Sequence, residues 1–198
     1  MNKLKIYKLL RTILILTAIV LAILVVIKYY KSYKTDSVAK HTIERIEEKK
    51  EKDEETEPIQ EIDEEIGGYK VVGIIRIPKI DLEYPILGET NQNSLNISIT
   101  KFWGNKINEI GNVTLAGHNN LNGRMFGRIK KLEIGDVIEL TDIQNVTLKY
   151  EVFKTYIIDP NDITCILPEE EGTREVTLIT CTNGRSNRYI VKAREINL

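Results

Sequence analysis

Two side chains with nucleophilic and acid–base chemistry each stand at the end of a stretch that is typical of a β-strand. His118 closes the run NVTLAGH, and Cys181 closes the run EVTLITC. A cysteine thiolate attacks carbonyl carbons, and an imidazolium protonates a leaving amine. Because the chain has only 2 cysteines and 2 histidines, this pair is the first candidate for covalent acyl transfer.

An arginine follows the candidate nucleophile at hairpin distance. Arg188 begins the run RYIVKAR, directly after the turn TNGRSN. Alternate residues of a strand face the same way, so Ile179 and Cys181 share a face, and a hairpin through this turn brings Cys181 near Arg188. A guanidinium is always charged, stabilises an oxyanion or a bound peptide, and lowers the pKa of a nearby thiol. Arg185, within the same turn, is the competing arginine.

Each candidate also has an ordinary structural interpretation. A single cysteine at a strand end is more often a small buried apolar residue than a nucleophile. A single histidine is likewise more often structural, and an arginine in a hairpin is usually solvated. We interpret the second cysteine, Cys165, as structural, and His41 lies in no motif. The combination of the three residue types, rather than any one of them, favours catalysis.

The elements that must position these residues are short runs rich in Val, Ile, Thr and Tyr. Gly, Pro and Asn separate the runs, which is the pattern of an all-β domain. Strands are predicted near residues 70–77, 84–87, 112–116, 137–140, 147–158, 176–181 and 189–193, and brief helices near 94–102 and 125–130. So many short strands predict a closed barrel or a sandwich, a class that does not itself specify chemistry.

Charge divides the chain of 198 residues into three regions. Residues 1–40 carry 8 basic and 1 acidic side chains, residues 41–66 carry 4 and 12, and residues 67–198 carry 16 and 16. The third region is long enough to bury a core, and its balanced charge argues against a nucleic-acid partner. The low cysteine and histidine counts exclude a disulfide framework and a cysteine zinc cluster.

An apolar run near the N-terminus predicts a membrane anchor. Residues 12–27 carry no charge, and a helix over residues 9–30 is roughly 33 Å long, enough to cross the roughly 30 Å hydrocarbon core of a bilayer. Three lysines separate this run from the nearest cleavage candidate, Ser37-Val38-Ala39, so we predict an uncleaved signal anchor. The basic residues before it favour a cytoplasmic N-terminus (residues 1–8) and an extracellular domain.

The next region predicts a spacer. Residues 31–68 are charged, mostly acidic and poor in aromatic residues, so they cannot bury enough apolar surface to fold alone. Pro58 argues against a continuous helix here. We therefore expect a spacer that carries a catalytic barrel, residues 69–198, above the membrane.

Longer motifs around the candidates resemble a known family. TLAGHNN around His118 and TLITCTNGRSNRYIV around Cys181 are similar to the paired signatures of the sortases. IIRIPKIDLEYPIL, SLNISITKFWG and MFGRIKKLEIGDVIEL resemble the first sortase strands, the early helix and the stretch after the catalytic histidine. The resemblance covers most of residues 70–194. It implies an all-β fold, a closed eight-stranded sortase-type barrel with one or two short helices, behind the transmembrane helix.

The resemblance also implies an activity. A sortase is a cysteine transpeptidase in the membrane of a Gram-positive bacterium. It cleaves an LPXTG-type sorting signal after threonine, holds the surface protein as a thioacyl enzyme and transfers it to a peptidoglycan amine. Carried over by motif, Cys181 is the nucleophile, His118 the general acid and base, and Arg188 the residue that binds substrate or oxyanion. Thr180 and Asn119 are expected to contribute to substrate binding.

Sequence features that differ between sortase classes favour class D. The family's arginine opens the last strand, which favours Arg188 over Arg185, and the short segment from Cys181 to Arg188 resembles class D. No long helix-rich insertion separates Pro160 from Thr177, which argues against class B. The spacer has no Asp-Pro or Asp-aromatic motif, which argues against the pilin-polymerising class.

No cofactor is expected. Some sortases bind calcium, and Glu169, Glu170 and Glu171 form an acidic run. Adjacent carboxylates in one loop are usually solvated, however, and a calcium site needs oxygen ligands that converge from several segments. We therefore predict that the protein has no metal site.

Two other functions remain as alternatives. An L,D-transpeptidase is also β-rich and uses Cys and His, but its SHGC surround is missing here. A non-catalytic, membrane-tethered β domain, such as an adhesin or scaffold, would keep Cys181 and His118 in its core. Thiol reactivity distinguishes an enzyme from a non-catalytic β domain, because a buried structural cysteine resists modification in the native state.

Overall fold

The protein is described from a computed structural model, which covers residues 3–53, 62–182, 184 and 186–196. Two compact units make up the chain, Met1–Ser37 and Val38–Leu198. The first unit is helical, and the second holds the β-sheet. Arg185 and the stretch 54–61, which includes Pro58, lie outside the described residues.

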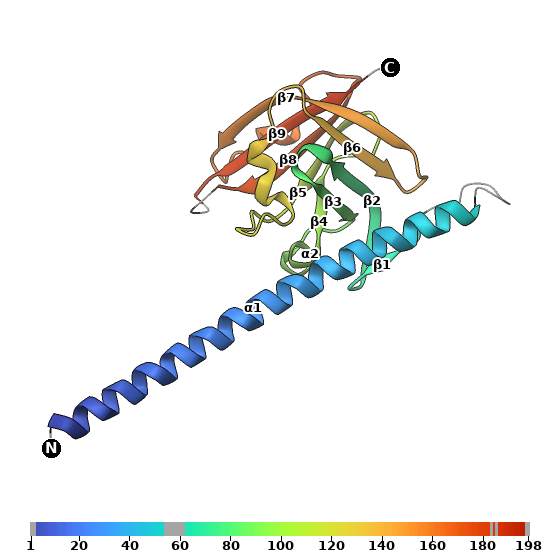
Figure 1. Cartoon of the computed structure of the whole chain (residues 1–198). Helices are drawn as coiled ribbons and strands as arrows, with labels where there is room; N and C mark the ends of the chain where they lie inside the picture. Colours follow the sequence, from blue (N-terminus) through green and yellow to red (C-terminus); the bar gives the residue numbers. More distant parts are fainter. Residues whose placement is uncertain (1–2, 54–61, 183, 185, 197–198) are drawn as a thin grey trace. The chain divides into compact units, whose positions relative to one another are not determined.

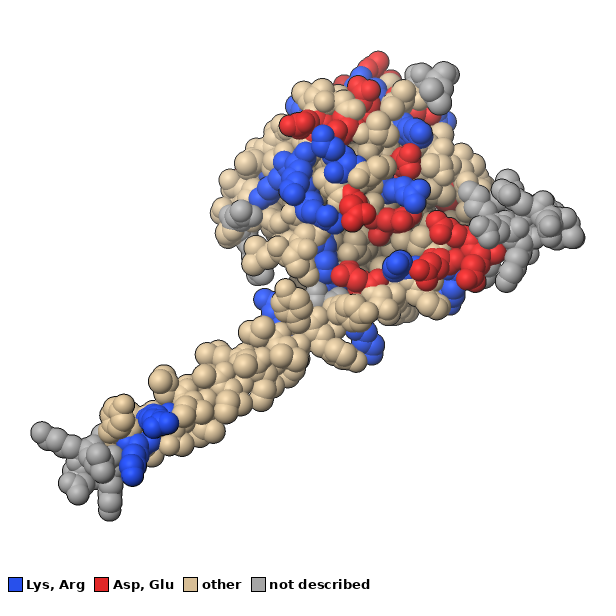
Figure 2. All heavy atoms as spheres, viewed as in Figure 1, with Lys and Arg blue, Asp and Glu red and all other residues tan. Residues whose placement is uncertain are grey.

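The first unit is the N-terminal part of α1 (Lys3–Asp53). Its large apolar side chains, from Tyr7 to Ile27, are exposed, and Figure 2 shows a long stretch of this helix without charged side chains. By length and composition the helix can cross a membrane. The predicted anchor therefore has a structural counterpart.

The second unit is a sheet closed into a barrel (Figure 1). Its strands are β1 (Glu65–Ile66), β2 (Tyr69–Ile77), β3 (Leu82–Leu87), β4 (Ile99–Trp103), β5 (Gly111–Ala116), β6 (Val137–Asp142), β7 (Thr147–Ile158), β8 (Arg174–Cys181) and β9 (Arg188–Glu195). Its helices are α2 (Gln92–Ile97) and the 3₁₀ turns η1 (Pro78–Ile80), η2 (Phe126–Lys131) and η3 (Thr164–Ile166). Within the described residues the order is β1-β2-β3-β4-β5-β8-β9-β7-β6, and a β2–β6 pairing closes the ring. The predicted eight-stranded barrel, β2 to β9, is confirmed.

Three neighbouring strands determine the position of the candidate residues. β5 pairs with β8 in parallel, and β8 pairs with β9 antiparallel. The end of β5, the end of β8 and the start of β9 therefore meet at one edge of the barrel.

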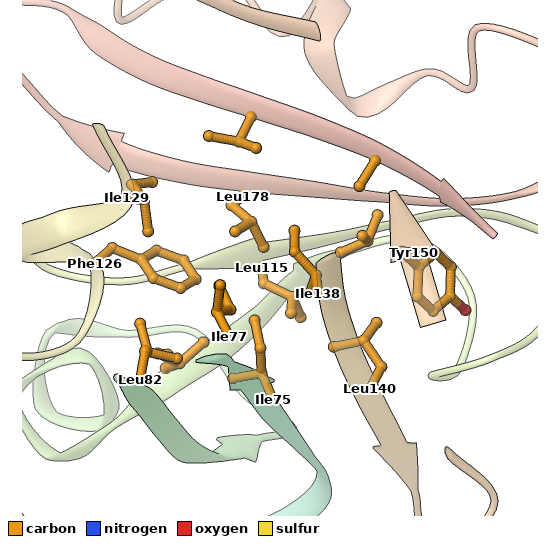
Figure 3. Packing of buried hydrophobic residues seen from close by; sticks show 14 of the residues in the cluster. Ile75, Ile77, Leu82, Leu115, Phe126, Ile129, Ile138, Leu140, Tyr150 and Leu178 are labelled. Atoms are coloured by element: carbon orange, nitrogen blue, oxygen red, sulfur yellow. The ribbon is translucent and has the colours of Figure 1, made fainter. Parts of the chain in front are cut away.

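Alternation along the strands fills the barrel interior. Val176, Leu178, Val191 and Ala193 of β8 and β9 belong to the main core cluster. Figure 3 shows Leu178 beside Phe126 and Leu115, which come from η2 and β5. The residues that alternate with these four along each strand face away from the barrel interior. β8 and β9 therefore have a separate outer face, which carries Cys181.

The end of α1, from Val38 onward, belongs to the second unit and packs on the outside of its sheet. Ala39, Ile43 and Ile46 are buried, and the two isoleucines share a cluster with residues of β2 and β3, including Val71 and Leu87. Arg45 also forms an ion pair with Glu64, at 3.1 Å between Nη2 and Oε2. Part of the segment expected to be a spacer is thus helical and packed on the barrel.

One predicted helix is wrong over half of its length. A helix near residues 94–102 was expected, but α2 ends at Ile97 and β4 begins at Ile99. The capping box of Asn91 and Ser94 starts the helix. It ends at Ser98, whose hydroxyl donates to the Pro85 carbonyl of β3 at 2.6 Å, and the chain then pairs with β3 as a strand.

Candidate active site

The last residue of β8 lies opposite the first residue of β9. Cys181 pairs with Arg188 in the antiparallel register. The turn between them is closed by the Thr182 N–H, which donates to the Asn187 carbonyl at 2.9 Å, and by the Asn187 N–H, which donates to Thr182 Oγ1 at 3.2 Å. Paired residues of two strands project to the same face. The predicted hairpin thus brings the thiol and the guanidinium to one face.

His118 lies beside the same strand end from the other side. In the parallel β5–β8 pairing Ala116 lies opposite Ile179, and the Gly117 N–H donates to the Ile179 carbonyl at 3.2 Å. His118 is two residues beyond Ala116, just as Cys181 is two residues beyond Ile179. The structure therefore brings the histidine and the cysteine to neighbouring positions at the edge of the sheet.

Gly117 is required for this close packing. A Cβ at this position would lie 2.8 Å from the Phe126 ring, so any larger residue would displace η2 or the strand end. The Phe126 N–H also donates to the His118 carbonyl at 3.1 Å. The backbone around the histidine is thus held between the buried Phe126 ring and β8.

Two side chains link the histidine segment to the cysteine strand. The Thr180 hydroxyl, buried beside the cysteine, donates to the Gly117 carbonyl at 2.7 Å. Asn119 Nδ2 donates to the Cys181 carbonyl at 2.8 Å. Both residues were expected to bind substrate. The structure shows that each holds the segments of His118 and Cys181 together.

The two cysteines have different surroundings. Cys165 is 2% exposed, and burial raises the pKa of its thiol, which keeps it protonated and unreactive. Cys181 is partly exposed, and both thiols are free. Of the two, Cys181 is therefore the one available to a peptide.

An apolar strip crosses the outer face next to the cysteine. In register, Ala116 lies opposite Ile179, Ile179 opposite Ile190, and Ile190 opposite Tyr156. Burial raises the pKa of Tyr156 to about 12, so its phenol stays neutral at physiological pH. These four residues form an uncharged row two residues along β8 from Cys181, in which Ala116, Ile179 and Tyr156 are partly exposed and Ile190 is buried.

Two of the acidic residues considered as calcium ligands, Glu169 and Glu170, form ion pairs with lysine and arginine side chains. Glu169 Oε1 accepts from Lys154 Nζ at 3.0 Å and from Lys192 Nζ at 3.3 Å, and the Lys154 hydrogen bond lowers the pKa of this carboxyl. Glu170 pairs with Arg194 at 2.9 Å. Over the described part of the chain, no group of three or more His, Cys, Asp or Glu side chains could hold a metal ion.

Comparisons with known proteins identify the family of this chain. A family model described as the sortase domain matches residues 75–196, more than half of the chain. The chain belongs to the sortase family. The match includes all three candidate catalytic residues and the four strands that carry the apolar strip.

Named sortases from several classes are similar to this sortase. Sortase A of Bacillus anthracis is 34% identical over 62% of this chain and 58% of its own length. Sortase D of Bacillus subtilis is 30% identical over 64% of this chain and 63% of its own length. The chain thus spans about three fifths of the length of these two relatives. A solved structure of a Clostridium perfringens sortase D5 transpeptidase is 30% identical, with a TM-score of 0.64, and covers 81% of this chain and 99% of that one.

The sequence analysis missed a buried ionic cluster at the far end of the same two strands. Glu175 of β8 and Lys192 of β9 are almost completely buried, and Arg194 Nη2 donates to Glu175 Oε1 at 2.9 Å. The signal was present, because counting back along the hairpin from the Cys181–Arg188 pair places Glu175 opposite Arg194.

Proposed function

We propose that this sortase is a membrane-anchored cysteine transpeptidase that cleaves an LPXTG-type sorting signal after threonine and transfers the surface protein to a peptidoglycan amine. The observation that carries the proposal is the register that sets Cys181 opposite Arg188, with the His118 segment linked to both sides of Cys181 through Thr180 and Asn119. Nucleophile, acid and cation then share one edge of a rigid sheet.

The first half of the reaction forms a thioester. The Cys181 thiolate attacks the carbonyl carbon of the threonine, and Arg188 stabilises the oxyanion that forms. The imidazolium of His118 donates its proton to the glycine nitrogen as the C–N bond breaks. The C-terminal peptide leaves as a neutral amine, and the N-terminal part stays on the sulfur.

The second half reverses the roles. The acceptor amine attacks the thioester carbonyl, neutral His118 takes a proton from that amine, and Cys181 leaves as a thiolate. The new amide joins the surface protein to the wall precursor, and the thiolate–imidazolium pair is restored.

The apolar strip beside Cys181 supports a peptide substrate. An extended peptide whose threonine carbonyl lies at Cys181 can run along β8 and place apolar residues on Ile179 and Ala116, which are partly exposed neighbours. Contact with these uncharged side chains favours the leucine and proline of an LPXTG-type motif over charged residues.

The anchor supports a location at the cell membrane. We propose that α1 crosses the membrane once, with a cytoplasmic N-terminus and an extracellular barrel, because basic residues are more numerous before the apolar run than after it. Surface proteins and wall precursors would then reach Cys181 on the extracellular side.

We also propose that the enzyme is of class D. The segment between Cys181 and Arg188 is short, and the similarity to the sortase D5 structure extends over almost all of that chain. Relatives named sortase A are as similar to this chain in sequence as the relative named sortase D. A measured substrate preference, rather than sequence identity, therefore tests the class.

The test uses the full chain in detergent, because residues 39–46 pack on the barrel. The protein is incubated with LPXTG-type peptides and hydroxylamine, and the products are identified by mass spectrometry. We expect a C-terminal threonine hydroxamate. Intact peptides across a broad library, with Cys181 also inert to a methanethiosulfonate reagent, would contradict the proposal and favour the non-catalytic β domain.

A further inference from the structure

Three side chains from three adjacent strands bind the loop that joins β7 to β8, residues 159–173. Asn112 Nδ2 of β5 donates to the Ile166 carbonyl at 2.8 Å. The Thr177 hydroxyl of β8 lies 3.3 Å from the Cys165 carbonyl, and Lys192 Nζ of β9 donates to the Leu167 carbonyl at 2.7 Å. Three consecutive carbonyls, two in the 3₁₀ turn η3 and one in the residue that follows it, are thus held against the sheet.

Lys192 is the charged member of this set, and it is buried. Its side chain is 1% exposed, and Nζ lies 3.3 Å from Glu169 Oε1 and 3.9 Å from Glu175 Oε2. A buried ammonium destabilises a protein unless carbonyls and carboxylates surround it, and an apolar residue often fills such a position at least as well. Lys192 therefore contributes something that an apolar residue would not, namely a fixed attachment for the loop.

The attachment lies on the same outer face as the chemistry. Lys192 pairs with Thr177, and four residues further along β8 Cys181 pairs with Arg188. These two pairs are about 14 Å apart along the strands, whereas an extended five-residue motif spans about 17 Å. A peptide that starts at Cys181 and follows β8 therefore reaches the β7–β8 loop.

We propose that Lys192 is a positioning residue for the sorting peptide: by holding η3 against the sheet, it fixes the part of the β7–β8 loop that the N-terminal end of the motif meets. This inference rests on the proposed function. Lys192 touches neither the scissile bond nor Cys181, so it acts on peptide binding and not on the bond-breaking step.

The test compares Lys192→Met with Lys154→Met in the full chain. Methionine keeps the length and apolar stem of lysine but removes the donor and the charge. Lys154 is the matched control, because it pairs with the same Glu169 carboxylate from an exposed position, with 47% of its side chain accessible. The measurements are KM and kcat for transpeptidation of an LPXTG-type peptide and the rate of Cys181 alkylation by iodoacetamide.

Lys192→Met should raise KM about tenfold and leave kcat and the alkylation rate within about twofold of wild type. Lys192→Arg, which keeps the charge and donors, should return KM toward wild type, and Lys154→Met should leave it unchanged. If Lys192→Met fails to fold, the double variant Lys192→Met/Glu175→Gln replaces it, because it also removes the buried negative charge that lies 3.9 Å from the Lys192 ammonium.

Two results would overturn the inference. One is an unchanged KM in a folded variant that lacks the Lys192 ammonium. The other is an equal loss of kcat and alkylation rate with KM unaltered, which would mean that Lys192 supports the strands under Cys181 instead. A wild-type protein that transfers no peptide at all would contradict the proposed function, so the two failures are distinguishable.

Discussion

The two ends of the β8–β9 pair are built for opposite purposes. At one end Cys181 and Arg188 are partly exposed, beside a turn. At the other end Glu175 and Lys192 are buried and lie within an ionic network. Both pairs project from the same outer face of the same two strands. This contrast has a physical reason: a thiol must remain accessible to react, whereas ionic side chains that order a loop are most effective when water is excluded.

The largest expected effect is at the reactive end. Cys181→Ala should reduce transpeptidation by roughly 10⁴-fold or more, because no other group can form the thioester. The melting temperature should stay within about 2 °C of wild type, since a partly exposed thiol contributes little packing. Steady-state kinetics and thermal unfolding measure both effects.

Cys165→Ala is the matched control. It should keep most of the activity but lower the stability, because Cys165 is a buried residue of η3, within the β7–β8 loop. A Cys165→Ala variant that loses all transfer while remaining folded would mean that the nucleophile is misassigned.

Arg188→Lys should produce the next largest loss. A point charge replaces a planar fork, and the loss of oxyanion stabilisation should reduce kcat/KM by about 100-fold. The comparison variant is Arg185→Lys, in the same turn, which should retain activity. An active Arg188→Lys together with an inactive Arg185→Lys would transfer the role to Arg185.

At the buried end, Glu175→Gln should change stability rather than reactivity. The carboxylate accepts from the Glu169 N–H at 2.8 Å and from Arg194, and a neutral amide leaves these donors and Lys192 poorly paired. We expect a loss of about 2 kcal/mol in the free energy of unfolding, measured in urea. The rate of Cys181 alkylation should stay unchanged; a parallel fall would show that the two ends are not separable.

Acidification should destabilise the buried end through Glu169. Its pKa is lowered in the fold by the Lys154 hydrogen bond. The stabilisation of the folded state by this carboxylate is therefore complete at pH values above the pKa of the unfolded state, about 4.3. It is lost as the pH falls through the pKa of the folded state. At pH 7 the free energy of unfolding of the wild type should exceed that of Glu169→Gln by at most about 1 kcal/mol, because the carboxylate is partly exposed. Urea unfolding should show that this difference in unfolding free energy shrinks in acid. A difference that grows in acid would contradict the lowered pKa of Glu169.

The smallest expected effect concerns metal. Lysine and arginine side chains already neutralise Glu169 and Glu170, so neither EDTA nor added calcium should change the transpeptidation rate by more than about twofold. Parallel assays in the two conditions decide this. Stimulation by calcium that disappears in Glu169→Gln would show that the loop binds the ion after all.

Local pattern accounts for the parts of the fold that could be predicted. The long strand 147–158 has the bounds expected from its run of β-branched and aromatic residues, and the short turn TNGRSN was enough to bring Cys181 and Arg188 together. β4 was missed because a helix cap at Asn91 precedes it, and the hydrogen bond that Ser98 donates at the end of the helix is accepted by the Pro85 carbonyl, on another strand.

Contacts between distant segments account for the rest. Asn119 and Cys181, or Lys192 and Leu167, are joined through pairings of strands far apart in sequence, and no local pattern specifies such contacts. The packed end of α1 has a subtler cause. Ala39, Ile43 and Ile46 recur at helical spacing within a charged region, so its overall composition indicated a spacer while three positions form an apolar stripe.

The most direct test of the central claim is to trap the acyl-enzyme. The full chain in detergent is mixed with an LPXTG-type peptide without any acceptor amine, quenched in acid and analysed by intact-protein and peptide-map mass spectrometry. We expect an added mass equal to the peptide up to its threonine, carried on the Cys181 peptide and removed by hydroxylamine. An adduct on Cys165, or an identical adduct on the Cys181→Ala variant, would contradict this expectation.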